Sequence, residues 1–560
     1  MSLSEYPSAL GNPFTLGVAS GDPLPDGVVL WTRLAPKPLN GGGMDGQQDI
    51  AVDWEVATDV GFRDIVQTSY EHPTATMKAR AVAEAKLAHS VHLEVVGLES
   101  ATRYYYRFIA GGYEAGGRTK TAPEPTVEVP TIAFAFANCQ SWQGGLYPVY
   151  RHIAQDEELD LVVHLGDYIY ESEPAGGGPR VYETPAPTDL VSFRNRHAEY
   201  KTDPDLQDAH AAHPWVVTWD DHDVENDYAG TYSWYISTAD FAERRAAAYQ
   251  AYYEHMPLRP SWVLGGQQWK NINLYCKISY GKLAQFVMLD TRQYRTVQPC
   301  GDQLVACEDR FRDLIVDENG QTRHHTILGD TQEHWLKEVL TSSSPLWNVI
   351  ANGILMFEYD HRYPAGSESY YLDGWDGYVA TRNRLFKHLV ENEVPNPVVV
   401  TGDIHAAWVA DLKYLPEDPN NSFKRREAVT VGTELLGTSV SSGLSQGWID
   451  TYRNALEANP HVKYFDSRQG GYVRCDLTSD RFHADFLLAS SLEDRLAPVH
   501  TIASFEVYPE ADPFLRQGAV LTYRESPQQG DGSAPSSSPI RWIRRLIALL
   551  RSHFGKLLRS

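Results

Sequence analysis

Polar side chains that can bind metal ions follow several apolar runs of this 560-residue chain. They are Cys139, Asp167, Tyr170, Asp221, His222, Asn352, Asp403 and His405. Two metal ions that share a bridging carboxylate can activate a water molecule and neutralise the charge that develops when a phosphate ester is cleaved. The residue types therefore predict metal-assisted hydrolysis.

One group of these residues predicts a site for a trivalent or tightly bound ion. Asp167 is the natural bridging carboxylate, which makes it a candidate catalytic residue as well as a ligand. Cys139, Tyr170 and His405 would complete this site, because thiolate and phenolate are strong anionic donors.

The remaining oxygen ligands predict a second ion that is held less tightly. Asp221, Asn352 and Asp403 offer carboxylate and amide oxygens, which suit Ca²⁺, Mg²⁺ or Mn²⁺. Asp220 directly precedes Asp221 and is an alternative carboxylate for the same position.

Two further side chains are candidates for acting on the substrate itself. His222 has the chemistry to protonate a leaving alkoxide or to bind phosphate. Arg292 follows the apolar run Gln285–Leu289, and its guanidinium group suits phosphate oxygens. With Asp167, these two residues form the predicted catalytic set.

The elements that must position these residues alternate between strand and helix from about residue 131 to 510. The predicted strands are Thr131–Ala137, Leu159–Leu165, His213–Trp219, Gln285–Leu289, Trp347–Ile350 and Pro397–Val400. The predicted helices are Asp189–Asp203, Ala239–His255, Asp330–Ser342 and Thr381–Asn392. This alternation predicts an α/β domain in which ligands gather at the carboxyl ends of the strands. Three later runs are candidates for strands of a second sheet: Ala428–Gly432, Gly471–Leu477 and His483–Leu488.

Residues 1–125 contain short strand-like runs separated by Pro and Gly clusters. The runs are Phe14–Ala19, Gly27–Arg33, Asp49–Ala57, Ser90–Val96 and Arg103–Ala110. This spacing predicts an all-β sandwich domain that serves for packing. The Pro-rich stretch 121–130 is predicted to link it to a second domain at 126–515, because the chain is too long for one core.

The C-terminal end differs from the rest of the chain in composition. Residues 516–539 are predicted to form a flexible linker. Residues 540–560 place apolar side chains on one helical face and six Arg or Lys residues on the other. A basic amphipathic helix of this kind favours contact with a membrane surface. Docking on the acidic body of the protein and an appended expression tag are the alternatives.

Charge and cysteine content restrict the class of protein. The net charge of −24 argues against a nucleic-acid-binding module, which requires a basic face. Cys300 and Cys307 are predicted to form a disulfide bond, which favours an oxidising compartment. Cys276 and Cys475 are either buried thiols or a second bridge. The start of the chain lacks the features of a secretory signal, so we expect a cytoplasmic protein or a mature form with an added Met.

Two other functional interpretations compete with a metal-dependent hydrolase. Residues 443–447 fit the pattern G-x-S-x-G, which would make Ser445 the nucleophile of a serine hydrolase if a strand preceded it. In a non-catalytic surface-binding protein, the polar residues at strand ends would be incidental. Sensitivity to metal chelators rather than to serine-directed inhibitors would separate the enzyme classes.

Several motifs together resemble the PhoD-like metallophosphatases (the alkaline phosphatase D family), which include iron-dependent phospholipases D of actinobacteria. The matching stretches are GVASGDPLPDGVVLWTRLAP, ANCQSW, VVHLGDYIYE, TWDDHDVENDYAG, LDTRQYR, ANGILM and VVVTGDIHAAWVADL. The resemblance extends from about residue 14 to 507. GDYIYE, WDDHD and GDIH in this order form a specific signal, whereas each alone would not.

The resemblance implies a fold, an activity and a location. It implies an αββα metallophosphatase sandwich with an N-terminal Fn3- or Ig-like domain, and hydrolysis of phosphomonoesters, phosphodiesters or both. Phospholipid diesters are the alternative substrates, which would make the protein a phospholipase D. It also implies export by the twin-arginine route to the periplasm or the extracellular space. The start of this chain and its basic C-terminal segment depart from that pattern.

The resemblance also implies specific ligands and ions. The thiolate ligand corresponds to Cys139, the bridging carboxylate to Asp167 and the phenolate to Tyr170. The remaining correspondences are Asp221 for the WDDHD motif, Asp403 and His405 for the GDIH motif, and Asn352 by analogy with the wider superfamily. Fe³⁺ accompanied by Ca²⁺ is implied, and Mn²⁺, Mg²⁺ or Zn²⁺ could replace Ca²⁺.

Overall fold

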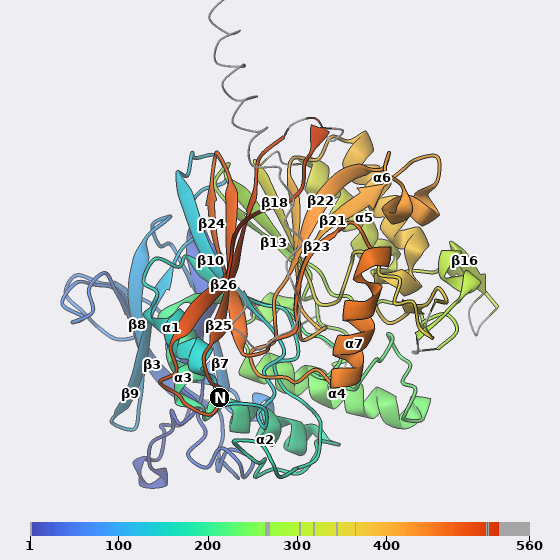
Figure 1. The fold of residues 1–560 in the computed structure, drawn as a ribbon. Coiled ribbons are helices and arrows are strands. Elements are labelled where there is room, and N and C mark those ends of the chain that lie inside the picture. The colour runs from blue at the N-terminus through green and yellow to red at the C-terminus, as the bar shows by residue number, and fades with distance from the viewer. Residues whose placement is uncertain are drawn as a thin grey trace, which may run out of the picture. The chain divides into compact units, whose positions relative to one another are not determined.

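Two large β-sheets contain most of the strands (Figure 1). This computed structural model describes residues 3–263, 269–301, 304–316, 320–342, 345–364, 366–510, 512 and 515–525. Among these residues, no helix has both the length and the apolar character needed to span a membrane. The predicted basic helix at 540–560 and most of the predicted linker lie outside the described residues.

The first sheet has ten strands and is parallel at its centre. Its strands are β1 (Val18–Leu24), β2 (Gly27–Arg33), β7 (Ser90–Val96), β10 (Thr131–Ala137), β11 (Leu161–His164), β12 (Pro214–Val217), β24 (Gly471–Thr478), β25 (Phe482–Ala489), β26 (Val499–Val507) and β27 (Val520–Arg524). β10, β11 and β12 pair in parallel, and their apolar sequences suit strands covered on both faces. β27 belongs to this sheet, so ordered structure continues beyond residue 515, where we expected the linker to begin.

The second sheet has seven strands. They are β13 (Cys276–Tyr280), β14 (Ala284–Met288), β18 (Trp347–Asn352), β20 (Pro397–Thr401), β21 (Ala407–Tyr414), β22 (Val429–Leu436) and β23 (Val462–Asp466). β14, β18, β20 and β22 pair in parallel. Of the three late runs considered for a second sheet, only the first lies here, as β22. The other two are β24 and β25 of the first sheet, because β24 pairs with β10.

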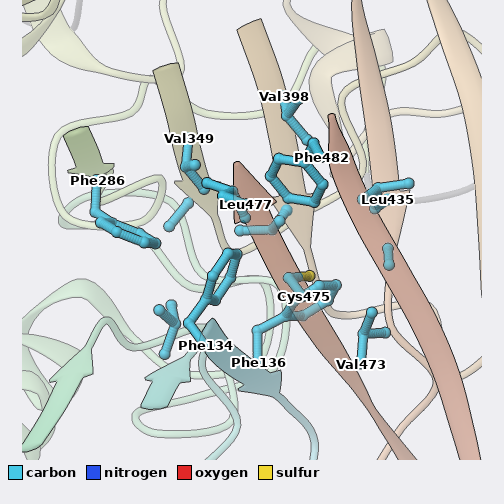
Figure 2. Packing of buried hydrophobic residues seen from close by; sticks show 14 of the residues in the cluster. Phe134, Phe136, Phe286, Val349, Val398, Leu435, Val473, Cys475, Leu477 and Phe482 are labelled. Atoms are coloured by element: carbon cyan, nitrogen blue, oxygen red, sulfur yellow. The ribbon is translucent and has the colours of Figure 1, made fainter. Parts of the chain in front are cut away.

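The two sheets pack face to face through a large apolar core (Figure 2). Phe134 of β10 lies at its centre, with ring centroids 5.0 Å from Phe286 and 6.0 Å from Phe482. Cys475 is buried in the same core as a free thiol, and Cys276 is also free. A second disulfide bridge is therefore not formed.

Helices cover the outer face of each sheet. α1 (Pro148–Gln155), α2 (Leu190–Lys201), α3 (Pro204–Ala212) and α4 (Thr238–His255) pack on the first sheet, and α5 (Gly329–Ser342), α6 (Val379–Glu391) and α7 (Gln446–Ala455) pack on the second. α2 begins at a capping box formed by Asp189 and Ser192. The predicted helix over 189–203 stops earlier, because Asp203 caps a separate helix that has Pro204 at its first position.

The N-terminal region forms a sandwich that shares one of its sheets with the rest of the protein. Its own sheet contains β3 (Ile50–Ala57), β4 (Ile65–Thr68), β5 (Thr76–Met77), β6 (Ala81–Ala83), β8 (Arg103–Ala110) and β9 (Tyr113–Lys120). An apolar cluster joins this sheet to β1, β2 and β7. β1 also pairs in parallel with β12, where Gly21 lies opposite Trp215.

Two short antiparallel pairs complete the described strands. β15 (Leu304–Val305) pairs with β19 (Tyr370–Tyr371), and β16 (Leu314–Val316) pairs with β17 (Thr322–His324). Cys300 and Cys307 form the predicted disulfide bond beside β15.

Candidate metal centre

The predicted ligands meet because parallel strands from both sheets end at the same edge. Cys139 follows β10 and Asp167 follows β11. Asp221 follows β12 in the same way, and Asp403 and His405 follow β20 of the second sheet. The carboxyl ends of parallel strands share one edge of a sheet, so side chains far apart in the sequence converge.

Four ligand candidates have left-handed backbone conformations. The φ angle is 55° at Cys139, 53° at Asp167, 72° at Asp403 and 56° at His405. Each costs about 1 kcal/mol or more for a non-glycine residue, and such residues cluster at functional sites. The turns aim these side chains inward at the ends of their strands.

Gly166 permits a close approach between two of these strand ends. Its φ is 105°, and a Cβ at this position would lie 2.5 Å from the Cβ of Asp220. Any larger residue would push the Asp167 turn away from the Asp220–Asp221 turn.

Cys139, Asp167 and His405 form the first group of candidate ligands. The Cys139 sulfur, an Asp167 oxygen and a His405 ring nitrogen lie within 4.8 Å of one another. The Tyr170 hydroxyl joins them, because it donates to Asp167 Oδ2 at 2.9 Å and lies 3.1 Å from His405 Nε2. His405 Nδ1 lies 2.9 Å from the carbonyl oxygen of Gly443, which fixes the orientation of the ring.

Two further groups continue from the first. Asp167, Asp221 and His222 form one, and Asp220, Asp221 and Asp403 form the other, each with ligand atoms within 4.8 Å of one another. Asp167 is shared by the first and second groups, and Asp221 by the second and third. Asp167, which we expected to be the bridging carboxylate, is therefore common to two adjoining groups of candidate ligands.

The donor set and its electrostatics fit bound cations. Among the described residues, Asp220 Oδ2, Asp221 Oδ1 and Asp403 Oδ2 are buried and accept no hydrogen bond. Burial raises the pKa of Asp220 to about 7. Burial and neighbouring carboxylates raise the pKa of Asp167 and of Asp403 well above the usual range. Carboxylates packed this densely need positive charge to stay ionised.

The pKa shifts of Cys139, Tyr170 and His405 also fit a site that binds cations. Burial, followed by the charge of Asp167, raises the pKa of Cys139 and of Tyr170 well above their ordinary values. A cation reverses this effect, because metal binding displaces the protons of thiol and phenol ligands. Burial lowers the pKa of His405 to about 4, which keeps the imidazole neutral, as a metal ligand must be.

His222 lies on the more open side of the site. Its side chain keeps 24% of its exposure, and its Nδ1 lies 2.8 Å from Glu171 Oε2. Burial lowers its pKa, but the carboxylates of Glu171, Asp221 and Asp167 outweigh burial and raise it well above the usual value. Without bound ions, these carboxylates therefore favour the imidazolium form of His222.

Asn352 and Arg292 are each held by a side chain outside the candidate ligand set. Asn352 is the last residue of β18, and its amide oxygen accepts a hydrogen bond from Trp375 Nε1 at 3.1 Å. Arg292 is completely buried, and its guanidinium pairs with Asp220 at 2.5 Å and with Asp373 at 2.8 Å. Arg292 thus lies behind the carboxylates rather than at an open phosphate position.

Several residues that shape the site are not among the predicted site residues. Asp220, considered only as an alternative, belongs to the third group. Asp223 and Glu171 bind the turns that follow β11 and β12, and their places inside WDDHD and GDYIYE were the available signal. Ser442 donates to the Tyr170 hydroxyl at 2.7 Å, and nothing in the sequence around it indicates this contact.

Ser445, the alternative nucleophile, has a structural role. Its side-chain oxygen accepts a hydrogen bond from the backbone N–H of Trp448 as the N-cap of α7. The residues between β22 and α7 form a loop, so the strand that a nucleophile elbow requires does not precede it.

The fold and the site define the class as a mixed α/β protein with a candidate metal centre at its converging strand ends. Residues 134–486 match the PhoD-like phosphatase family, and residues 3–123 match the N-terminal domain of PhoD-like phosphatases. The chain belongs to the PhoD-like phosphatase family and is a hydrolase. The non-catalytic interpretation is thereby excluded.

Individual relatives agree with this assignment. The chain is 43% identical over 535 residues to alkaline phosphatase D of Bacillus subtilis (strain 168), covering 94% of this chain and 86% of the relative. A solved structure described as "Structure of PhoD" superposes with a TM-score of 0.81 at 39% identity, covering 100% of this chain and 99% of the other.

Proposed function

We propose that this phosphoesterase hydrolyses phosphomonoesters, phosphodiesters or both by direct attack of an activated water molecule, without a covalent phosphoenzyme. The observation that carries the proposal is the convergence of Cys139, Asp167, Tyr170 and His405 on one point, with Asp221 shared by the adjoining carboxylate groups. Bound ions would supply Lewis acidity there, lowering the pKa of a water ligand and polarising the phosphoryl oxygen.

The donor chemistry divides the ligands between two ions. Cys139, Tyr170 and His405 would hold Fe³⁺ together with Asp167, because anionic sulfur and phenolate oxygen favour a trivalent ion. Asp167 would also contact the second ion. Asp220, Asp221, Asp403 and the remaining lone pair of Asn352 would hold Ca²⁺, or Mn²⁺, Mg²⁺ or Zn²⁺ in its place.

His222 is the proposed general acid. Its Nδ1 is engaged by Glu171, so Nε2 is the atom from which a proton can pass to the leaving alkoxide. The charge of Glu171 favours the imidazolium form and fixes the ring, which lies against Tyr170 with ring centroids 4.4 Å apart and ring planes tilted by 32°. Arg292 is proposed to act on the carboxylates Asp220 and Asp221 rather than on phosphate.

Phospholipid diesters are the alternative substrates, and the basic amphipathic sequence at 540–560 favours them. A chain ending at residue 525 should cleave a soluble diester at the full rate and lose activity on anionic vesicles. Equal vesicle activity of both forms would remove the membrane role. The Cys300–Cys307 disulfide supports a periplasmic or extracellular location, because such bonds persist in oxidising compartments.

The fold assignment is also proposed in finer form. The order of helices, sheet, sheet and helices supports the αββα metallophosphatase architecture. The N-terminal sandwich is proposed to be of the Fn3 or Ig type.

The test of the proposed function is metal analysis of the purified protein together with its visible absorption spectrum and its activity on mono- and diesters. Stoichiometric iron with a charge-transfer band, and loss of hydrolysis on chelation, are expected. Cys139→Ala should lose the iron and the activity, whereas Cys475→Ala, which alters a buried thiol in the core, should keep both. Near-native turnover of Cys139→Ala would refute the proposed site.

A further inference from the structure

A buried network centred on Asp373 lies behind the candidate ligands. Asp373 follows β19 and is completely buried. Arg292 Nη1 lies 3.0 Å from its Oδ1 and 2.8 Å from its Oδ2. Gln298 Nε2 donates to the same Oδ1 at 2.7 Å, and Arg295 Nη2 also pairs with it. Asp373 is thus held firmly by three side chains.

Arg292 connects this network to the candidate ligands. Its Nε donates to Asp220 Oδ1 at 2.5 Å, and its Nη2 lies 3.6 Å from Asp221 Oδ1. One guanidinium therefore faces three carboxylates. Because Asp373 shares the positive charge of Arg292, Asp220 and Asp221 are neutralised less than they would be by an unshared arginine. Their remaining negative charge is available to a cation.

The same segment of chain reaches the cluster at a second point. Tyr371, in β19, donates its hydroxyl to Asp227 Oδ1 at 3.0 Å. The backbone N–H of Asp227 in turn donates to Asp221 Oδ2 at 2.8 Å. Gln298 Nε2 donates to the carbonyl oxygen of Asp227 at 2.7 Å. Asp221 is thereby oriented by Tyr371 through Asp227, independently of Arg292.

The Cys300–Cys307 disulfide stabilises this arrangement from outside. Gln298 precedes Cys300 by two residues, and β15, between the two cysteines, pairs with β19 through Leu304 and Tyr371. Cys307 also packs in a small apolar cluster with Tyr370 and Leu372. The cross-link therefore restrains the segment that presents Tyr371 and Asp373.

We propose that Asp373 is a positioning residue for the second ion, which orients Arg292 and determines how much negative charge Asp220 and Asp221 present to a divalent cation. The inference rests on the second ion of the proposed function and assigns Asp373 no contact with the ion or the substrate.

Calcium binding to the metal-free protein tests this role without relying on catalysis. Asp373→Asn retains the shape of the side chain and an oxygen that can accept from Gln298, but it removes the charge. Loss of residues that support metal ligands weakens metal binding by about 10- to 100-fold. Titration calorimetry with Ca²⁺, and then with Mn²⁺, should therefore show that Asp373→Asn binds each ion more weakly than the wild type by a factor of that size.

Asp376→Asn is the matched control. Asp376 is also buried and pairs with Arg382 at 2.7 Å, but the carboxylate that shares its arginines is Glu358, outside the ligand groups. This variant should bind Ca²⁺ as the wild type does. A circular dichroism spectrum of each variant establishes that the fold is retained.

The outcomes separate this inference from the proposed function. Wild-type protein that binds neither Ca²⁺ nor Mn²⁺ would overturn the proposed second ion and this inference together. If the wild type binds Ca²⁺ and Asp373→Asn binds it with the same affinity, this inference alone is overturned. An equal loss of Ca²⁺ affinity in Asp373→Asn and Asp376→Asn would also overturn it. If Asp373→Asn does not fold, Gln298→Met decides, because it removes the hydrogen bond that Gln298 Nε2 donates to Asp373 Oδ1. It should weaken Ca²⁺ binding about fivefold, the value of one hydrogen bond, and unchanged binding would refute the role.

Discussion

Asp223 shows how a single buried carboxylate fixes the relative positions of candidate ligands. Its Oδ1 accepts backbone hydrogen bonds from Tyr168 at 3.1 Å and Ile169 at 3.2 Å, and its Oδ2 accepts one from Asp220 at 3.0 Å. The donors belong to the turns that follow β11 and β12. Asp223 therefore joins the Asp167 turn to the Asp220 turn.

Substituting Asp223 should damage both stability and metal binding. Asp223→Ala leaves three buried N–H groups without acceptors, and each costs about 1–3 kcal/mol. We expect the free energy of unfolding in urea to fall by about 3 kcal/mol or more, with loss of bound metal. Asp223→Asn keeps one acceptor oxygen, so its free energy of unfolding should lie between those of the wild type and Asp223→Ala. Unchanged stability of Asp223→Ala would contradict the role of Asp223 in joining the two turns.

Ser445 offers a second test at the level of one residue. Because its side chain caps α7, Ser445→Ala should lower the free energy of unfolding by about 1 kcal/mol and leave ester hydrolysis intact. Steady-state kinetics and urea unfolding on the same preparation measure both effects. A well-folded Ser445→Ala protein without activity would restore the serine-hydrolase alternative.

At the level of elements, the core between the sheets aligns the two sets of strand ends. β10 presents Phe134 to β14 and β25 and ends two residues before Cys139. Across the same core, β20 contributes Val398 and Val400 and ends before Asp403. Packing of the sheets therefore determines the separation of ligands that come from different sheets.

Truncating Phe134 should weaken the fold without removing a ligand. Phe134→Ala should cost about 3–5 kcal/mol of unfolding free energy, the usual range for a buried aromatic residue. Metal content at room temperature should stay at the wild-type level as long as the variant remains folded. Val60→Ala, at a side chain that is 73% exposed, is the control and should change neither quantity. If Phe134→Ala lowered the free energy of unfolding by less than about 1 kcal/mol, the central place of Phe134 in the core between the sheets would be contradicted.

At the level of the whole molecule, the N-terminal region is built into the catalytic part. Beyond the β1–β12 pairing, Trp31 Nε1 donates to the carbonyl oxygen of Glu254 at 3.1 Å. Arg33 Nη1 lies 2.8 Å from His255 Nε2, and both residues are buried. These contacts join β2 to α4 on the covered face of the first sheet.

Removing residues 1–125 should therefore abolish folding rather than release an independent catalytic domain. The deletion exposes the edge of β12 and leaves the buried partners of Trp31 and Arg33 in water. We expect insoluble protein, or a soluble product that shows no cooperative unfolding transition. A chain ending at residue 525 is the control and should unfold as the full chain does. A stable, metal-binding fragment starting at residue 126 would refute this prediction.

Local sequence determined most of the elements and their chemistry. The run Gly27–Arg33 is β2 as predicted, and Asp189 starts α2 through its own side chain. The Cys300–Cys307 disulfide was likewise predicted from spacing and is present. These features depend on residues close together in the chain, whose periodicity and capping chemistry can be read directly. The proximity of Cys139 and Asp167 could be anticipated as well, because they follow neighbouring parallel strands of one sheet, whereas His405 follows a strand of the other sheet.

Only the tertiary structure decided which sheet each late strand joins and what surrounds each ligand. β24 and β25 joined the first sheet because β24 pairs with β10 more than three hundred residues earlier in the chain. Arg292 turned inward because Asp220, Asp221 and Asp373, from separate segments, surround its guanidinium. Strand pairing and the partners of a buried charge depend on contacts between distant residues, and the periodicity of one segment contains no information about its partner.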